Sequence, residues 1–231
     1  MQSLLGRMPL LLGRMPLLLL LALLGIAATA PATADPITGA SCINNSCQGG
    51  VYTLYYNGNA LPDADPVHQT FRVFLDINTT GYTGGGLFLD QVAIKVSSSV
   101  FAATLFSAPS GAANWLLQTG GINAGGCSGS GNGYECANSG PALNGGKGVA
   151  VPVATIYTWA FDVTVNNGTL NTAPGAASIK ARYVDNSGNK VGGLVSEPIT
   201  LQRDLRLPEP APVALLFGGL VAALALRRRR K

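Results

Sequence analysis

The sequence has a single histidine, His68, and charged residues make up only 11% of its 231 residues. A Ser-His-Asp catalytic site uses histidine as its base, and no Gly-x-Ser-x-Gly segment is present to supply a matching serine. His68 follows the segment 63–67 and is predicted to be an exposed loop residue. Because no pattern in the sequence identifies a nucleophile, a general base or a set of metal ligands, we expect a protein that is not an enzyme.

The glycine-rich segments 84–86 and 145–148 lack the GxxxxGK[ST] spacing and the following helix of a phosphate-binding loop, so they are predicted to be turns and bulges. Asp63 and Asp65 are separated by one residue and form a weak calcium candidate, because hard cations bind clustered oxygen ligands. They do not form an EF-hand loop. No cofactor is predicted otherwise.

The basic character of the chain comes from its two ends, which hold seven of its fifteen cations. Residues 35–206 contain eight Lys or Arg against ten Asp or Glu, a net charge of minus two. A nucleic-acid partner is therefore not expected, because it requires a basic patch on the folded domain.

Residues 1–34 have the form of a secretory signal peptide. Its parts are Arg7 and Arg14 in the positive n-region, 17–26 as the apolar h-region, and Ala32, Thr33 and Ala34 as the cleavage site before Asp35. Residues 28–30 also fit the small-residue rule, but Pro31 would then follow the cut directly. The chain is predicted to be exported.

The C-terminal segment contains an apolar run from Ala211 to Leu226, including Leu216 and Gly219, without a charged or hydrogen-bonding side chain. As a helix it is ~24 Å long, a little short of the ~30 Å hydrocarbon core, and snorkelling and local thinning make up the difference. The cations that follow should remain cytoplasmic and stop translocation. They are Arg227, Arg228, Arg229, Arg230 and Lys231. A buried core helix is the alternative, but the run lacks the polar face of such a helix.

The tripeptide Pro208, Glu209 and Pro210, followed by this span and its basic end, resembles the PEP-CTERM sorting signal of Gram-negative bacteria. That signal is similar in layout to the LPXTG signal and is processed by a membrane enzyme, exosortase. The resemblance covers about a tenth of the chain. It implies that the tripeptide is the recognition element, that exosortase is a partner, and that cleavage near the tripeptide removes the span. The precursor would be membrane-anchored, and the mature form would lie in the cell envelope or outside the cell.

Between the signal peptide and the sorting segment (207–231), residues 35–206 predict one all-β domain. Short alternating apolar runs separated by Gly, Asn and Ser turn signals favour an antiparallel β-sandwich, Ig-like or jelly-roll-like. The predicted strands are 51–56, 70–77, 86–97, 100–106, 115–118, 157–165, 177–184 and 193–201. The odd-numbered residues from Tyr157 to Val165 should share one face, while Thr70, Arg72, Phe74 and Asp76 should share the opposite face of their strand. Residues 185–189 are predicted to form a hairpin turn in which Asn and Gly adopt positive φ.

The four cysteines are predicted to form disulfides, because an exported chain meets an oxidising periplasm. Of the three possible pairings, proximity favours Cys42 with Cys47 and Cys127 with Cys136. Metal binding is the alternative, but neither pair has Cys-x-x-Cys spacing.

Two functional hypotheses follow. The first is a structural or adhesive surface or matrix protein, associated through the sorting-signal resemblance with exopolysaccharide and biofilm. The second is a carbohydrate-binding module that recognises exopolysaccharide. Candidate sugar-stacking residues are Trp115, Trp159, Tyr52, Tyr55, Tyr56 and Tyr82. Aromatic residues at alternate positions of a strand are more often buried in the core than exposed to a ligand.

Overall fold

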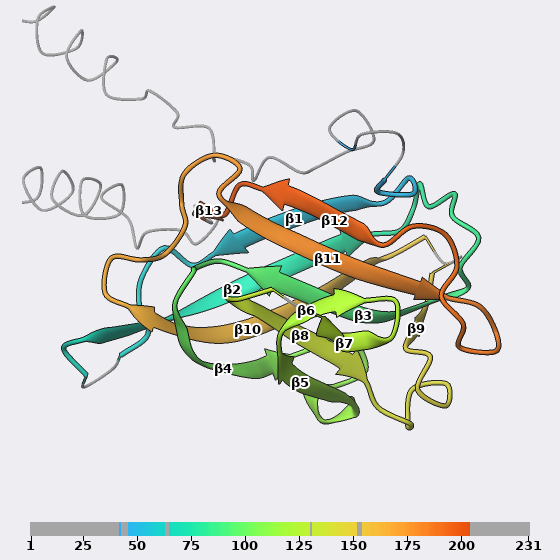
Figure 1. Cartoon of the computed structure of the whole chain (residues 1–231), viewed down its shortest axis with the longest axis horizontal. Helices are drawn as coiled ribbons and strands as arrows, with labels where there is room; N and C mark the ends of the chain where they lie inside the picture. Colours follow the sequence, from blue (N-terminus) through green and yellow to red (C-terminus); the bar gives the residue numbers. More distant parts are fainter. Residues whose placement is uncertain (1–41, 43–45, 63–64, 130, 152–153, 204–231) are drawn as a thin grey trace, which may run out of the picture. The chain divides into compact units, whose positions relative to one another are not determined.

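The structure is a computed structural model that describes residues 42, 46–62, 65–129, 131–151 and 154–203. These residues belong to one compact unit within 32–231. The elements are β1 (Val51–Tyr56), β2 (His68–Asn78), β3 (Phe88–Lys95), β4 (Val100–Ser107), the 3-10 turn η2 (Ala112–Asn114), β5 (Trp115–Thr119), β6 (Gly121–Asn123), β7 (Gly126–Gly129), β8 (Tyr134–Ser139), β9 (Val149–Ala150), β10 (Ile156–Asn166), β11 (Ala177–Val184), β12 (Val195–Ile199) and β13 (Gln202–Arg203). The domain is therefore nearly all β (Figure 1).

Two main sheets and one small hairpin account for all of these strands. Sheet A has the order β13-β1-β2-β10-β4, and sheet B has the order β12-β11-β3-β8-β5, with β9 pairing with β3. The strands β6 and β7 form a separate two-stranded hairpin. Every pairing is antiparallel except the short parallel contact of β1 with β13. The predicted all-β, antiparallel class is confirmed.

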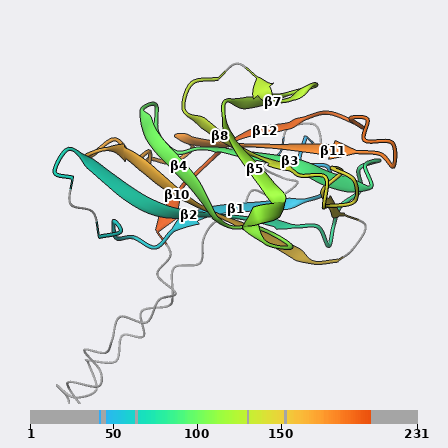
Figure 2. The ribbon, with the colours of Figure 1, turned by 90° about the horizontal axis from the view of Figure 1, so that it is seen from below.

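The core lies between the two sheets, which form separate layers in the rotated view (Figure 2). Alternate residues of each strand point inward because a strand repeats every two residues. The buried cluster includes Leu75, Trp159 and Phe161 from sheet A, and Ile94 and Ile179 from sheet B. Burial of each such side chain contributes roughly 1.5–3 kcal/mol, so this interface is the main source of stability.

The predicted inward face of β10 is confirmed, with Tyr157 partly buried at its start and Trp159, Phe161, Val163 and Val165 fully buried. The strands β1 and β11 have the predicted bounds. In contrast, β12 is shorter than the predicted 193–201. The strands β6, β7, β8, β9 and β13 were not predicted. The strands β6, β7, β9 and β13 are glycine-containing or only two residues long, and the six-residue sequence of β8 does not alternate between apolar and polar residues.

The predicted turn after β11 is confirmed by a bridge between Val184 and Lys190. One oxygen of the Asp185 carboxylate accepts hydrogen bonds from the N–H groups of Ser187 and Asn189, at 2.8 and 2.9 Å. Gly188 has a φ of 81°, whereas no asparagine of this turn has positive φ. The prediction that asparagine shares this role is wrong, because the aspartate side chain stabilises the turn instead.

Several predicted segments lie outside the described residues. They are the signal peptide with its cleavage site, the Pro-Glu-Pro tripeptide, the apolar span and the basic end. Within the part of the chain that the structure describes, no helix is long and apolar enough to cross a membrane.

Candidate functional site

The face of sheet A that points away from the core carries a row of paired side chains, here called the outer face of sheet A. The four residues of β2 that were predicted to share a face lie there, and each of them faces a residue of a neighbouring strand. The pairs are Thr70 with Thr164, Arg72 with Asp162, Phe74 with Tyr55, and Asp76 with Thr158. Phe101 and Phe106 of β4 complete the row at its edge.

Arg72 is the centre of this row. Its guanidinium donates two hydrogen bonds to the Asp162 carboxylate, Nε to Oδ1 at 2.7 Å and Nη2 to Oδ2 at 2.8 Å. The hydrogen bond to Asp162 raises the pKa of Arg72 further above its usual value, so the cation is permanent. The guanidinium carbon lies 3.2 Å from the centroid of the Phe106 ring. This cation–π contact orients a phenyl ring that remains 55% exposed.

Tyr55 and Phe74 stack with ring centroids 5.1 Å apart and an angle of 12° between their planes. Each ring therefore masks one face of the other. Phe101 and Phe106 also have one covered face each, but they are exposed, whereas Tyr55 and Phe74 are only partly exposed. Because a sugar ring stacks on the face of an aromatic ring, the Tyr55–Phe74 pair offers less ring surface to a ligand.

The His68 imidazole lies between Asp65 and Phe101. Its Nδ1 donates a hydrogen bond to Asp65 Oδ2 at 2.5 Å, and the Val67 N–H donates to the other carboxylate oxygen at 2.8 Å. These bonds lower the pKa of Asp65, and the bond from His68 is the largest cause. The imidazole also stacks on the Phe101 ring, with centroids 4.2 Å apart.

The prediction that His68 is an exposed loop residue is wrong. It is the first residue of β2, pairs with Asn166 of β10, and has a side chain that is only 17% exposed. The pairing extends β2 two residues beyond the predicted start, because β10 is long enough to supply a partner.

A cavity of about 250 Å³ adjoins this histidine. Its walls are formed by Ala60, Leu61, Asp65, Pro66, His68, Gln69 and Asn167. The walls combine a carboxylate, an imidazole and two carboxamides with small apolar surfaces, a set that suits a neutral ligand with several hydroxyl groups. Among these described lining residues there is no serine, threonine or cysteine to act as a nucleophile.

Most of the predicted stacking candidates belong to the core. Trp115 and Trp159 are buried and meet edge to face, with centroids 5.3 Å apart. Tyr52 is fully buried, and Tyr82 stacks on Tyr183. Among the described residues, the aromatic side chains that are exposed are Phe101 and Phe106. They were missed because exposure depends on which strand forms the sheet edge.

The calcium candidate gains no support from the described residues. Both oxygens of Asp65 accept the hydrogen bonds described above, and Asp63 lies outside the described residues. Within the described ranges, no group of three or more His, Cys, Asp or Glu side chains is placed to hold a metal.

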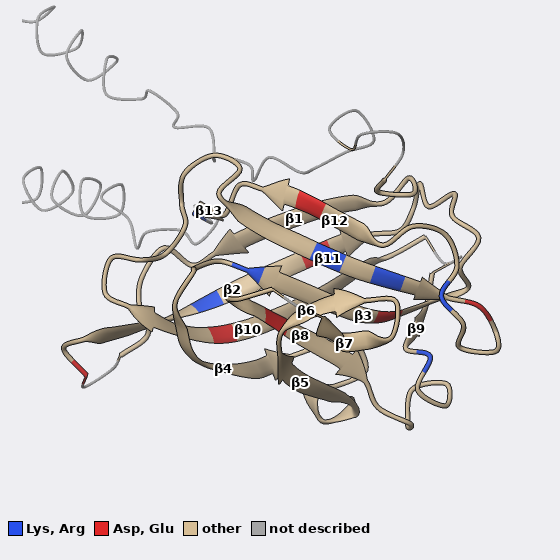
Figure 3. Ribbon diagram, in the orientation of Figure 1, with Lys and Arg blue, Asp and Glu red and all other residues tan. Residues whose placement is uncertain are grey.

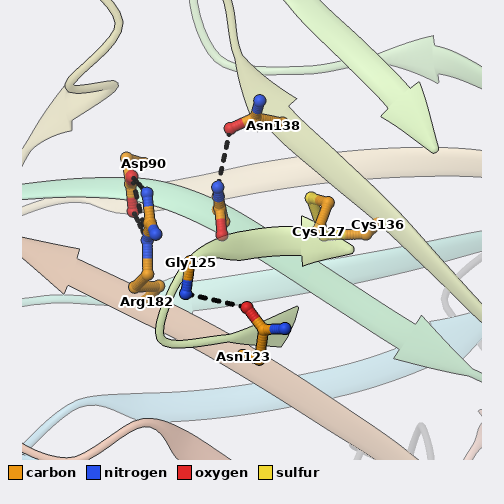
Figure 4. The surroundings of a disulfide bond; sticks show 8 residues. Asp90, Asn123, Gly125, Cys127, Cys136, Asn138 and Arg182 are labelled. Atoms are coloured by element: carbon orange, nitrogen blue, oxygen red, sulfur yellow. Dashed lines mark hydrogen bonds and ion pairs between the residues drawn. A yellow bond between two sulfur atoms is a disulfide. The ribbon is translucent and has the colours of Figure 1, made fainter. Parts of the chain in front are cut away.

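Both predicted disulfides are present, Cys42 with Cys47 and Cys127 with Cys136, with Cα atoms 5.5 and 5.7 Å apart. The second bond ties the β6–β7 hairpin to β8 of sheet B (Figure 4). None of the cysteines is free. The predicted pairing by proximity is confirmed, and it fits an oxidising compartment.

The β6–β7 hairpin is also held by an arginine of sheet B that forms an ion pair on that sheet. Arg182 of β11 binds the Asp90 carboxylate of β3 (Figure 4). Arg182 also donates a hydrogen bond to the Ala124 carbonyl oxygen, which lies between β6 and β7, at 3.1 Å. Burial raises the pKa of Asp90, and the contact with Arg182 opposes that rise. The hairpin covers part of sheet B, whereas the exposed phenyl rings belong to sheet A.

Comparison of the sequence with models of known protein families found no match, and a search of curated proteins found none either. The site is therefore interpreted from its own geometry.

Proposed function

We propose that this chain is an exported, non-enzymatic surface or extracellular-matrix protein that is sorted by an exosortase and linked to exopolysaccharide or biofilm. The observation that carries the proposal is the pair of local disulfides, because such bonds persist in oxidising compartments. The signal-peptide form of residues 1–34 supports export. The PEP-CTERM resemblance of residues 207–231 supports a membrane-anchored precursor.

The intact mass of the protein, taken from membrane and culture-medium fractions with and without reduction, tests this proposal. We expect a mature chain that begins at Asp35, ends near Pro208 and gains four hydrogen masses on reduction of its two disulfides. A mass that retains Arg227 to Lys231 would contradict exosortase processing. Four free thiols in exported protein would contradict the disulfide assignment.

We propose a carbohydrate-binding module for exopolysaccharide as the second candidate function, on the basis of the cavity beside His68 and the exposed Phe101 ring. Aromatic faces bind the apolar side of a sugar ring, and the cavity walls supply carboxylate, imidazole and carboxamide groups for its hydroxyls. The cavity is smaller than the ~300–1,000 Å³ typical of sites for drug-sized ligands. It therefore suits one small unit rather than a long segment.

Affinity electrophoresis in gels containing the cell's own exopolysaccharide separates the two candidates. A binding module should be retarded in proportion to polysaccharide concentration, and Phe101→Ala should abolish the retardation. Leu116→Ala is the matched control, because Leu116 is similarly exposed but lies on β5 of sheet B. Equal mobility with and without polysaccharide would exclude the binding module and leave the first proposal unaffected.

We also propose, from its two packed antiparallel sheets, that the domain is an Ig-like or jelly-roll-like sandwich. The net negative charge of residues 35–206 gives no basis for a nucleic-acid partner.

A further inference from the structure

The four edge strands of the two sheets are not equally protected against pairing with another chain. The edge strand β12 contains Glu197 and Pro198, and β13 is two residues long and contains Arg203. In contrast, β4 and β5 both come from residues 96–134, which contain no Asp, Glu, Lys, Arg or His (Figure 3). Natural sheets protect their edges with charge, proline, short length or β-bulges. The strands β4 and β5 contain no charge and no proline, and the irregularities of β4 leave its central residues 102–105 regularly paired with β10.

Of these two uncharged edges, β4 is the longer, with eight residues against five in β5. Within the described ranges, β10 is the only strand that pairs with β4. The side chains of Phe101, Ala102, Thr104 and Phe106 are exposed. Irregularities interrupt the pairing near both ends of β4, and the residues between them, 102–105, pair regularly with β10.

The side chains of β4 are sorted between the two faces of sheet A. Ala102 lies opposite Thr164 and Thr104 lies opposite Asp162, which places both on the outer face. Phe106 is on the same face, because its ring contacts Arg72. Ala103 and Leu105 alternate with them and lie opposite the buried residues of β10.

We infer that β4 pairs with β4 of a second copy of this chain, antiparallel, around a twofold axis at Thr104. Residues that oppose each other in an antiparallel pair must share one face. The twofold axis must therefore place one residue opposite its own copy, and it cannot lie level with the midpoint between two successive residues of the strand. In this register Thr104 opposes Thr104, and Ala103 of each copy opposes Leu105 of the other, within the stretch 102–105 that pairs regularly with β10. The two sheets A become one continuous sheet.

The side chains are complementary in this register. A Thr–Thr pair across strands is favourable because the two hydroxyls hydrogen-bond. The small Ala103 side chain leaves room for the larger Leu105 side chain of the other copy, on the inner face of the sheet. No charged side chain of β4 must be desolvated, because the strand has none. This assembly is independent of the first proposed function, since it does not involve the terminal segments. It uses the strand that carries Phe101, the residue assigned to the second candidate function.

Cysteine cross-linking of the full chain tests the register. Opposed Cα atoms lie ~4.5–5.5 Å apart, within disulfide reach, so Thr104→Cys should give a covalent dimer under mild oxidation that disappears on reduction. Ala102→Cys is the matched control, because its two copies would lie four residues out of register, ~13 Å apart. Cross-linking of both variants to the same extent, or of Ala102→Cys alone, would overturn the inference.

Sedimentation equilibrium of the unmodified chain provides the second measurement. We expect a concentration-dependent dimer whose dissociation constant rises roughly tenfold or more in Thr104→Lys, because two lysines would then oppose each other. Ser187→Lys adds the same charge in the exposed turn after β11 and should leave the constant unchanged. A chain that stays monomeric at all concentrations, or an equal response to both lysines, would overturn the inference.

Discussion

Replacement of Tyr52 and Tyr183 by phenylalanine tests the polar contact that joins the two sheets. Tyr52 lies in β1 of sheet A and Tyr183 in β11 of sheet B, both are fully buried, and their hydroxyl oxygens are 2.5 Å apart. Tyr52→Phe leaves the Tyr183 hydroxyl buried without this hydrogen bond, which should cost about 1–3 kcal/mol of stability. The double variant removes both polar groups, so its cost should be smaller than the sum of the two single costs.

The pair should also make the stability of the protein sensitive to alkaline pH. Burial is the largest cause that raises the pKa of both tyrosines above the usual value of about 10. Above pH ~10 the unfolded chain releases these protons while the folded chain retains them, so the stability from the pair is complete below that pH and declines as pH rises. The slope is about 1.4 kcal/mol per pH unit for each tyrosine, or roughly 3 kcal/mol for both.

Urea unfolding followed by circular dichroism, at several values between about pH 8 and pH 11.5, measures this effect. The wild type should lose stability above pH ~10 more steeply than the double variant, by the slope given above, and each single variant should lie between them. The lysines and the remaining tyrosines are the same in all four proteins, so the comparison isolates the contribution of this pair. An equally steep decline in the double variant would refute the assigned role of the pair.

Three further variants test an ion pair, a disulfide and a carboxylate–imidazole contact. Arg72→Met keeps much of the side-chain volume but removes both hydrogen bonds to Asp162, so urea unfolding should show a loss of about 2 kcal/mol; an unchanged midpoint would contradict the role of the ion pair. Joint replacement of Cys127 and Cys136 by alanine should cost roughly 2–3 kcal/mol in thermal unfolding, and an equal Tm would show that the disulfide does not stabilise the hairpin. The pKa of Asp65 is lowered in the folded chain, so its contribution is present above the ordinary value of 3.8 and is lost as pH falls through the lower folded pKa. Asp65→Asn should therefore lack part of the wild-type decline in acid, and superimposable acid unfolding curves would argue against this contact.

Local patterns in the sequence were sufficient for much of the secondary structure. The alternation of apolar and polar residues predicted the bounds of β1 and β11 and the buried face of β10. It also predicted which residues of β2 face away from the core, because side-chain direction in a strand follows directly from the period of two. Proximity of the cysteines predicted both disulfides, since short loops are the cheapest to close.

The candidate site was predicted only in part. Arg72 and Phe74 were assigned to the correct face of their strand, but their partners Asp162 and Tyr55 are distant in sequence, and their pairing depends on register. His68 was assigned to a loop because its place in β2 depends on pairing with Asn166 at the far end of β10, and the sequence around His68 does not show that pairing. A single sequence does not encode such long-range pairings locally.

The sequence by itself therefore determined the all-β class, the inward and outward faces of the long strands, and the cysteine pairing, all of which depend on residues close together in the chain. Only the tertiary structure decided that β4 lies at a sheet edge, that Phe101 and Phe106 are exposed while Trp115 and Trp159 are buried, and that Asp65 and His68 border a cavity. The physical reason is that strand order and register come from the packing of two whole sheets around one core. No local segment contains that information.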